Sequence, residues 1–292
     1  MLVKDFVVPA IVLASLSLSP VMHAQDGKPD SAVPRPAKDK VVQVDGWNRP
    51  VPEPAKGQVP GPAPKHDVSG VWALPGIRGG PNPPSARVYP ANGQPALPLT
   101  PEGEKALKAN RPEGSNTQTE GGTHDDPVNM CDPPGFPRVE LYDLIAMQMY
   151  QTPKEIVAIY ETNQAWRNIW TDGRELPKEF AEPRWYGYSV GKWTDDNTLL
   201  VDTVGLNPKS WIDDLGRPHS DELKVEETFH RANHDNMELT VTITDPKMYT
   251  KPWVALNKST FVLQPDWFDV REKICAPSDQ NVYQQIEDSF ER

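Results

Sequence analysis

The chain has 292 residues, a formal net charge of −11 at pH 7 and an isoelectric point near 5.1. No basic cluster interrupts this acidic composition, which excludes nucleic acid as an expected partner because phosphates need Lys and Arg to neutralise them. Beyond residue 24, no apolar run approaches the roughly 20 residues of a membrane-spanning helix, so we expect no membrane span in the mature chain.

Residues 1–24 have the pattern of a secretory signal peptide. Lys4 is followed by a mostly apolar run over residues 6–18, and Ala24 supplies the small residue before a cleavage site. The apolar run is too short to span a membrane. We therefore expect cleavage before Gln25 and a mature protein that is periplasmic or secreted.

Proline dominates the part of the chain that follows. Of the 33 prolines, 16 fall within residues 26–100. Residues 25–66 also lack apolar periodicity, which predicts a disordered Pro-rich leader before a single domain over residues 67–292. Thr100 and Pro101 are typical of a helix start, so we expect a short helix over residues 102–110.

Cys131 and Cys275 are the two cysteines of the chain. The oxidising compartment of an exported protein favours a disulfide between them. Such a bond would close a loop of 144 residues and stabilise the fold by about 4–5 kcal/mol in chain-entropy models. Two buried free thiols are the alternative.

Alternating apolar and polar residues predict strands through the second half of the chain. The segments are rich in Val, Ile, Thr, Tyr and Trp, which favour strands. They cover residues 144–150, 156–162, 166–172, 186–193, 198–205, 223–230 and 237–244. Shorter or later strands are expected at residues 67–72, 259–264 and 267–274.

The connections between these strands differ in length. Tight polar turns typical of hairpins lie at residues 163–164, 195–197 and 232–236. Long connections lie at residues 173–185, 206–222 and 246–257. Successive turns of an up-and-down meander fall at opposite ends, so we expect the long connections to form a mouth opposite the tight turns. Loops on a rigid scaffold commonly carry function, which directs attention to that mouth.

Residues 70–72 read Gly-Val-Trp, and lipocalin-type barrels begin with Gly-x-Trp on the first strand, where the Trp fills the closed end. Together with the meander, this pattern favours an all-β fold: an antiparallel up-and-down β-barrel of calycin-like type. The Pro-rich leader and the short helix precede the barrel. A β-sandwich and an open, strongly curved sheet are the alternatives.

Candidate proton-transfer residues lie near residue 220. His219 and Asp221 are two residues apart on an extended segment and can share a face, which suits acid–base chemistry near neutral pH. A loop hydrogen bond is the alternative role. Glu226 is a third candidate if the polar face of its strand points into the barrel, where burial raises a carboxyl pKa. On an outward face it is simply solvated.

Residues 187–191 match the Gly-x-Ser-x-Gly pattern of a nucleophile elbow. That elbow needs a helix after the turn, whereas a hairpin is expected here, so we do not assign Ser189 as a nucleophile.

The densest group of candidate binding residues is residues 166–174. Trp166, Asn168, Trp170 and Asp172 share one strand face and can line a cavity for a ring-bearing ligand. As core and turn residues they would have no binding role. The full expected binding set adds arginines for an anionic group and further rings: Arg138, Trp166, Arg167, Trp170, Asp172, Arg174, Tyr188 and Trp253.

No motif indicates a metal or a cofactor, and we expect neither. His230 and His234 flank a hairpin tip, and residues 124–126 lie in a polar loop, but neither group has a recognisable ligand spacing. No Gly-rich phosphate loop opens a helix.

Five segments, in order, resemble a large family of exported bacterial β-rich proteins. They are residues 131–138, 166–174, 187–193, 219–221 and 245–253, within a region of similarity over residues 67–277. The resemblance implies export and one shared β-rich domain. It implies no reaction, so no catalytic residue is transferred from it.

These features predict an exported cofactor-free enzyme, a hydrolase or lyase, that acts by acid–base chemistry on a small aromatic or ring-containing molecule. The first alternative is a lipocalin-like carrier without catalysis, and the second is a structural envelope protein tethered by its leader. Ionisable groups that converge in a cavity favour the enzyme, whereas an aliphatic lining favours the carrier.

Overall fold

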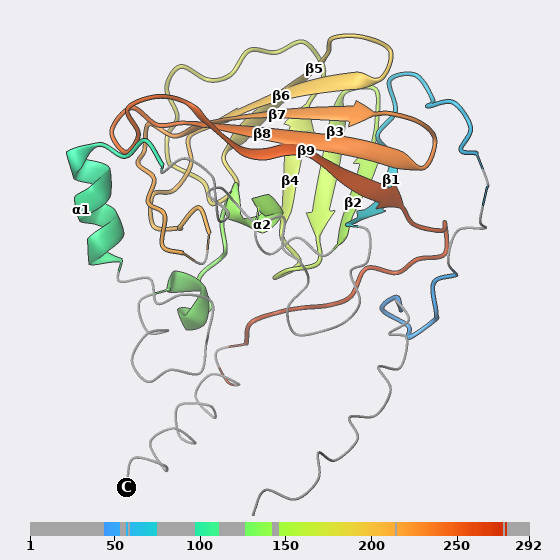
Figure 1. The fold of residues 1–292 in the computed structure, drawn as a ribbon, viewed down its shortest axis with the longest axis horizontal. Helices are drawn as coiled ribbons and strands as arrows, with labels where there is room; N and C mark the ends of the chain where they lie inside the picture. The colour runs from blue at the N-terminus through green and yellow to red at the C-terminus, as the bar shows by residue number, and fades with distance from the viewer. Residues whose placement is uncertain are drawn as a thin grey trace, which may run out of the picture. The chain divides into compact units, whose positions relative to one another are not determined.

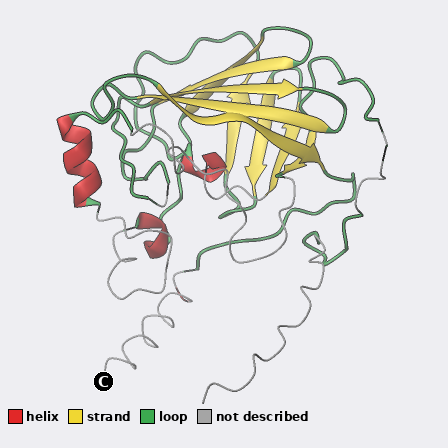
Figure 2. Cartoon of the chain, in the orientation of Figure 1, coloured by secondary structure: helices red, strands yellow, loops and turns green. Residues whose placement is uncertain are grey.

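The computed structural model describes residues 44–52, 57, 59–74, 97–110, 126–141, 146–213, 215–276 and 278, all within the unit of residues 41–292. The expected signal peptide and the first part of the leader lie outside these residues. The elements are β1 (Gly70–Ala73), α1 (Pro101–Ala109), η1 (Pro127–Met130), α2 (Arg138–Leu141), β2 (Ala146–Gln151), β3 (Glu155–Tyr160), β4 (Trp166–Trp170), β5 (Tyr188–Trp193), β6 (Thr198–Val204), β7 (Lys224–Arg231), β8 (Asn236–Thr244) and β9 (Trp253–Leu263) (Figures 1 and 2).

The nine strands form one closed barrel in which strands adjacent in the chain are also adjacent in the sheet. This confirms the predicted all-β barrel. Every pair is antiparallel except β4 and β5, which are parallel. An odd number of strands cannot alternate in direction all the way around a closed ring. One parallel pair is therefore unavoidable, and the expected fully antiparallel meander is wrong at that interface.

The parallel pair needs a crossover connection, because β4 ends at the opposite end of the barrel from the start of β5. Residues 171–187, here called the crossover segment, make this connection along the outside of the barrel. The connections from β6 to β7 and from β8 to β9 share one end, as expected, and α1 also lies there (Figure 1). The tight turn between β3 and β4 lies at this loop-rich end too, contrary to expectation.

The last strand differs from the prediction. The sequence predicts strands at residues 259–264 and 267–274, but β9 begins earlier, at Trp253, and the described residues after Leu263 form no further strand. Register shifts against β8 and the positive φ of Lys258 (52°) interrupt the two-residue alternation within β9. The strand is therefore hidden from a periodicity argument.

Local signals around α1 act as predicted. The Thr100 hydroxyl accepts a hydrogen bond from the Gly103 backbone N–H (3.0 Å), and Pro101 occupies the first turn. A cap of this kind satisfies one of the backbone donors that the first helical turn leaves unpaired.

Residues 44–52 fall within the leader that was expected to be disordered, but long-range hydrogen bonds order them. Asp45 Oδ2 accepts from the backbone N–H of Asp269 (3.4 Å), and the Gly46 N–H donates to the Asp269 carbonyl (2.8 Å). The Arg271 guanidinium donates to the backbone carbonyl of Val44 (2.8 Å). Partners more than 200 residues away in the chain give no local sequence signal.

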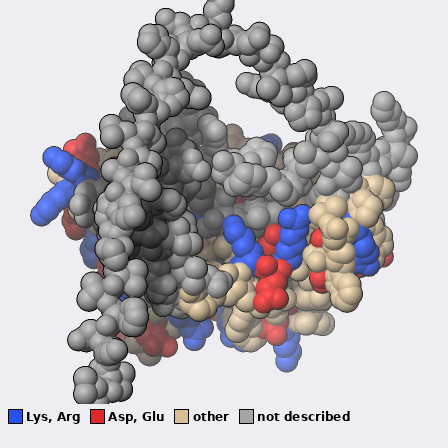
Figure 3. All heavy atoms as spheres, turned by 90° about the horizontal axis from the view of Figure 1, so that it is seen from below, with Lys and Arg blue, Asp and Glu red and all other residues tan. Residues whose placement is uncertain are grey.

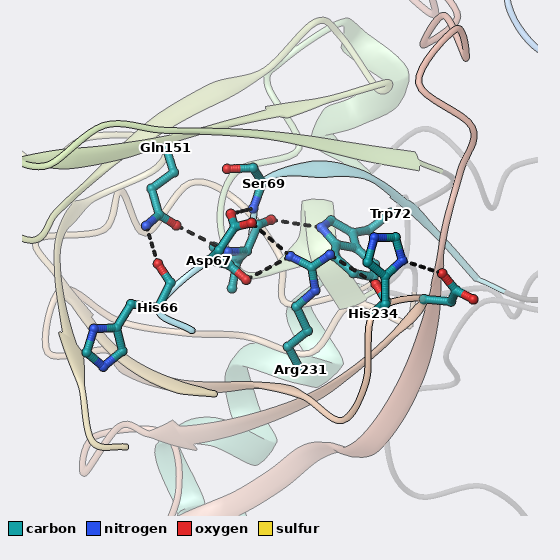
Figure 4. A network of polar contacts seen from close by, with 9 residues as sticks. His66, Asp67, Ser69, Trp72, Gln151, Arg231 and His234 are labelled. Carbon is teal, nitrogen blue, oxygen red and sulfur yellow. Dashed lines mark hydrogen bonds and ion pairs between the residues drawn. The ribbon is translucent and has the colours of Figure 1, made fainter. Parts of the chain in front are cut away.

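The end of the barrel opposite the long connections is closed by Trp72 and Arg231 (Figure 4). The Arg231 guanidinium lies over the Trp72 ring, 5.0 Å from its centroid, and donates to the carbonyls of Asp67 (2.9 Å) and His234 (3.0 Å). The indole of Trp72 donates to the Val68 carbonyl (2.9 Å). The Trp of the Gly-x-Trp pattern thus fills the closed end, as predicted.

Cys131 and Cys275 form the expected disulfide, which links the end of η1 to the segment after β9. None of the helices in the described part of the chain is long and apolar enough to cross a membrane. On the face seen in Figure 3, basic and acidic side chains of the described residues are interspersed.

Candidate functional site

A pocket of about 860 Å³ lies on the side of the barrel, between β4, the start of β5 and the crossover segment. Its volume is within the range of small-molecule sites. The lining combines rings and charges: Trp166, Trp170, Phe180, Trp185, Tyr186 and Tyr188, with Arg174, Arg184, Glu175, Glu179 and Glu182. The parallel pairing of β4 with β5 creates this pocket, because it forces the crossover segment to pass along the outside of the barrel.

The side chains of β4 alternate between the pocket and the barrel interior. Arg167 and Ile169 are buried inside, whereas Trp166, Asn168 and Trp170 face outward and line the pocket. The grouping is the one that the alternation predicts. The alternation does not predict where the group lies in the barrel: these residues are on the outer wall and not at the expected mouth.

Two of the rings are already covered by protein groups. The Arg174 guanidinium lies 3.6 Å from the centroid of the Trp170 ring and pairs with Asp172 (Nη2–Oδ2, 2.7 Å). Phe180 stacks on Tyr188 with ring centroids 5.7 Å apart. These contacts hold the crossover segment against the barrel wall.

Trp166 and Asn168 differ from these covered rings. The Trp166 side chain is 61% exposed and has no ring partner among the described residues. Asn168 donates through Nδ2 to Glu155 (2.7 Å), but its Oδ1 is buried without a hydrogen-bond partner. Trp166 therefore offers a ring surface that the protein itself does not use, whereas the Asn168 Oδ1 is not accessible to solvent.

Arg167 is the centre of a buried polar cluster inside the loop-rich end of the barrel. Its Nε donates to the Tyr160 hydroxyl (2.8 Å), and its Nη2 donates to Glu140 Oε1 (3.0 Å) and Glu227 Oε1 (2.5 Å). The Tyr160 hydroxyl in turn donates to Glu140. The ring of Phe136 lies against the guanidinium, 4.0 Å from Cζ. We call these five residues the interior cluster.

The segment that carries Glu140 explains why the expected mouth is not open. Residues 134–141, which include α2, are all buried, and the Phe136 N–H donates to the Trp185 carbonyl (2.9 Å). Gly135 packs so closely on Ser210 that a Cβ at this glycine would lie 2.5 Å from the Ser210 hydroxyl oxygen. This segment fills the loop-rich end of the barrel.

Burial is the main reason why the pKa of Glu227 is well above its ordinary value, and the Glu140 carboxyl adds to the effect while Arg167 opposes it. One guanidinium cannot neutralise two buried carboxylates. When both are ionised, Glu140 Oε2 and Glu227 Oε2 are buried without a hydrogen-bond donor. A proton on Glu227 leaves the cluster neutral and supplies that donor.

The pocket and the interior cluster meet at Arg167. Its Nη1 donates to the hydroxyls of Ser189 and Thr203 (3.4 Å each), and these two hydroxyls are 2.8 Å apart. Arg167 and Ser189 also belong to the pocket lining. Gly187 allows this close packing, since its φ is +64° and a Cβ there would lie 2.7 Å from Thr203 Cγ2.

Comparison of the chain with protein-family models, with curated proteins and with solved structures finds no match.

The structure separates the three residues expected to transfer protons. His219 is buried, whereas Asp221 is exposed and pairs with Lys247 (2.7 Å), so the two do not share a face. Glu226 is exposed on the outside of β7, and it is Glu227 that points into the barrel. None of the three lines the pocket.

His219 has a structural environment. Its Nδ1 lies 3.1 Å from the Ser220 carbonyl, a contact that requires an N–H at this nitrogen, so Nε2 accepts from the Ser210 hydroxyl (2.9 Å). Burial lowers the pKa of His219 below its ordinary value, although the Ser220 carbonyl and Asp245 act in the opposite direction. A neutral, doubly hydrogen-bonded imidazole anchors the connection between β6 and β7.

Of the eight expected binding residues, five line the pocket: Trp166, Arg167, Trp170, Arg174 and Tyr188. The other three lie elsewhere. Arg138 is buried on α2 and forms a two-pronged pair with Asp126 (2.8 Å for each bond), and Asp172 is occupied by Arg174. Trp253 is buried at the start of β9 with its ring 5.3 Å from that of Tyr249.

The sequence did contain a signal for Glu227. It follows Leu223 and Val225 and precedes Phe229 at two-residue steps, so it belongs to the apolar, inward face of its strand. Phe180 and Arg184 had no such signal, because they lie on the crossover segment, where periodicity predicts no direction.

Proposed function

We propose that this protein binds a small ring-containing molecule in the pocket beside β4. The single observation that supports this proposal is a concave site of about 860 Å³ whose wall offers the exposed ring of Trp166. Exposed aromatic rings in a concave site bind planar or ring-shaped ligands through their large, rigid contact area.

Binding is better supported than catalysis. His219, Asp221 and Glu226 lie away from the pocket and from one another. The rings and guanidinium groups that line the pocket suit recognition and orientation of a ligand more than proton transfer near neutral pH. The three carboxylates of the lining, Glu175, Glu179 and Glu182, are exposed to solvent.

The test is isothermal titration calorimetry, in which the purified protein is titrated with small aromatic acids, ethers, esters and glycosides. For a ligand of the pocket, Trp166→Ala should weaken binding roughly tenfold, about 1.4 kcal/mol. Trp47→Ala is the matched control, because Trp47 is 74% exposed and does not line the pocket. Equal affinities for the two variants would contradict the proposal.

A second candidate function is an acid–base hydrolase or lyase of the same ring-containing class. It is favoured by one observation, that Arg167 and Ser189 belong both to the pocket lining and to the hydrogen bonds of the interior cluster. In this hypothesis Glu227, kept protonated by burial, is the general acid. Turnover should then fall as pH rises through the Glu227 pKa and disappear in Glu227→Gln. Turnover that survives this substitution would exclude the hypothesis.

We also propose that the protein is exported and acts in the periplasm or outside the cell. The Cys131–Cys275 disulfide supports this location, because such bonds persist in oxidising compartments. Fractionation of cells that express the full chain should recover it, shortened by residues 1–24, outside the cytoplasm. A full-length protein confined to the cytoplasm would contradict export.

A further inference from the structure

The three arginines that line the pocket differ in what already neutralises them. Arg167 pairs with Glu140 and Glu227, and Arg174 pairs with Asp172. Arg184 is exposed, and its guanidinium pairs with no carboxylate in the part of the chain that the structure describes. The pocket therefore has one guanidinium group available to an outside anion.

The backbone holds Arg184 in place although its side chain is exposed. Its N–H donates to the Gly205 carbonyl (2.9 Å), and its carbonyl accepts from the Asn207 N–H (2.9 Å) and the Gly187 N–H (3.3 Å). The guanidinium rests over the Tyr188 ring, 4.1 Å from the centroid. A cation that is positioned before binding loses little freedom when a ligand arrives.

The rings of the pocket also differ in whether other protein groups cover them. Trp170 is covered by Arg174, and Tyr188 is covered by Phe180 and Arg184. Trp166 is the exposed ring of the lining that has no such cover among the described residues. The same molecule can thus meet an open indole and an unpaired guanidinium in one pocket.

We propose that the ligand is a planar ring that carries an anionic oxygen group, such as a carboxylate, sulfate or phosphate. The ring packs on Trp166 and the anionic group accepts hydrogen bonds from Arg184, whose planar donors match two oxygens at once. This inference rests on the proposed function and adds the chemical class of the ligand.

Three carboxylates of the pocket would favour a cationic ligand instead, and the ammonium probe described below tests this alternative. Glu175, Glu179 and Glu182 lie on the crossover segment and line the pocket, and all three are exposed to solvent. Salt screens their charges to the same degree as that of Arg184, which is exposed as well. Arg184 differs because its guanidinium is held over the Tyr188 ring, whereas no hydrogen bond or ion pair with another described residue fixes the three carboxylates. If they outweighed Arg184, the pocket would prefer a cationic ring.

The experiment compares three probes with one ring and different charges: 2-naphthoate, 2-naphthalenemethanol and 2-naphthylmethylammonium. Calorimetry with the full chain should show that 2-naphthoate binds about tenfold more tightly than the neutral alcohol, as expected for a charge-assisted hydrogen bond. Arg184→Gln should remove this preference and leave the affinity for the alcohol unchanged. Lys224→Gln is the matched control and should change 2-naphthoate affinity less than twofold, because Lys224 is an exposed cation on the outside of β7 that does not line the pocket.

Each alternative outcome decides a different point. If the alcohol or the ammonium probe binds as tightly as 2-naphthoate, or if Arg184→Gln leaves the preference intact, the anionic ligand class is wrong while a ring-binding pocket still stands. If no probe binds and Trp166→Ala changes nothing across the wider panel of ring compounds, the proposed function fails and the inference fails with it. Circular dichroism confirms that each exposed-site variant is folded.

Discussion

The interior cluster and the outer pocket lie on the two sides of β4 and share Arg167, but they use their polar groups in opposite ways. Inside the barrel, every N–H-bearing nitrogen of Arg167 has a protein partner. In the pocket, Arg184 lacks a carboxylate partner among the described residues, and Trp166 is uncovered. A polar group satisfied by the protein stabilises the fold, whereas one left over is available to a ligand.

Burial accounts for this difference. A charge at 0–2% side-chain exposure, as in Arg167, Glu140 and Glu227, must be paired within the protein because water cannot solvate it. The exposed Arg184 is hydrated when no ligand is bound, so leaving it unpaired costs little. The two regions should therefore respond very differently to the same kind of substitution.

The largest expected effect is on Arg167. Arg167→Met leaves two buried carboxyl groups without their cation and should lower the free energy of unfolding by about 3–5 kcal/mol. Arg174→Met is the control, because its pair with Asp172 is 45% exposed on the arginine side and contributes about 1 kcal/mol or less. Urea unfolding measures both.

Neutralising the carboxyls sharpens the same test. Adding Glu140→Gln and Glu227→Gln to Arg167→Met should recover part of the lost stability, since no buried charge then lacks a partner. If Arg167→Met and Arg174→Met cost the same, the interior cluster is not a buried charge network.

An intermediate effect is expected on the pH dependence of stability. The pKa of Glu227 is above its ordinary value of 4.5, so the folded protein retains a proton that the unfolded chain releases. The contribution of Glu227 to the free energy of unfolding is therefore complete below pH 4.5 and is lost as pH rises through the folded-state pKa.

Glu227→Gln should flatten this decline in the free energy of unfolding as pH rises above 4.5. Glu226→Gln, one residue away on the exposed face of β7, should not change the slope of the free energy of unfolding against pH. Burial also raises the pKa of Glu161, but that residue is present in both variants and cancels in the comparison. Identical slopes for the two variants would show that Glu227 is not protonated in the folded state.

The smallest stability effect is expected in the pocket. Trp166→Ala should change the free energy of unfolding by no more than about 0.5 kcal/mol, because the ring is largely exposed. The same substitution at the fully buried Trp72 should cost about 3–5 kcal/mol. A large loss at Trp166 would mean that this ring supports the fold and is not free for a ligand.

Local sequence patterns predicted much of the fold. Two-residue alternation located most of the strands, Thr100 marked the start of α1, and the Gly-x-Trp pattern placed Trp72 at the closed end. The disulfide followed from having two cysteines. Alternation failed in β9, where a register shift and the positive φ of Lys258 break the period.

The candidate site was only partly accessible from the sequence. The outward face of β4 followed from alternation, so Trp166 and Trp170 could be grouped correctly. His219 was placed with Asp221 because they are close in the chain, whereas the fold buries one and exposes the other. Proximity in sequence is a poor guide in a loop, where side-chain directions depend on long-range contacts.

The sequence by itself determined most of the strands, the helix cap and the inward or outward direction of side chains within regular strands, because each depends on residues a few positions apart. The cysteine pair followed from the presence of two cysteines in the chain. Only the tertiary structure decided that nine strands close on themselves, which requires the parallel pair of β4 with β5 and sends the crossover segment along the outer wall. The same closure brings Arg167 to Glu140 and Glu227, three residues from three separate elements. Contacts of this kind arise from how the whole sheet closes, and no short stretch of sequence specifies them.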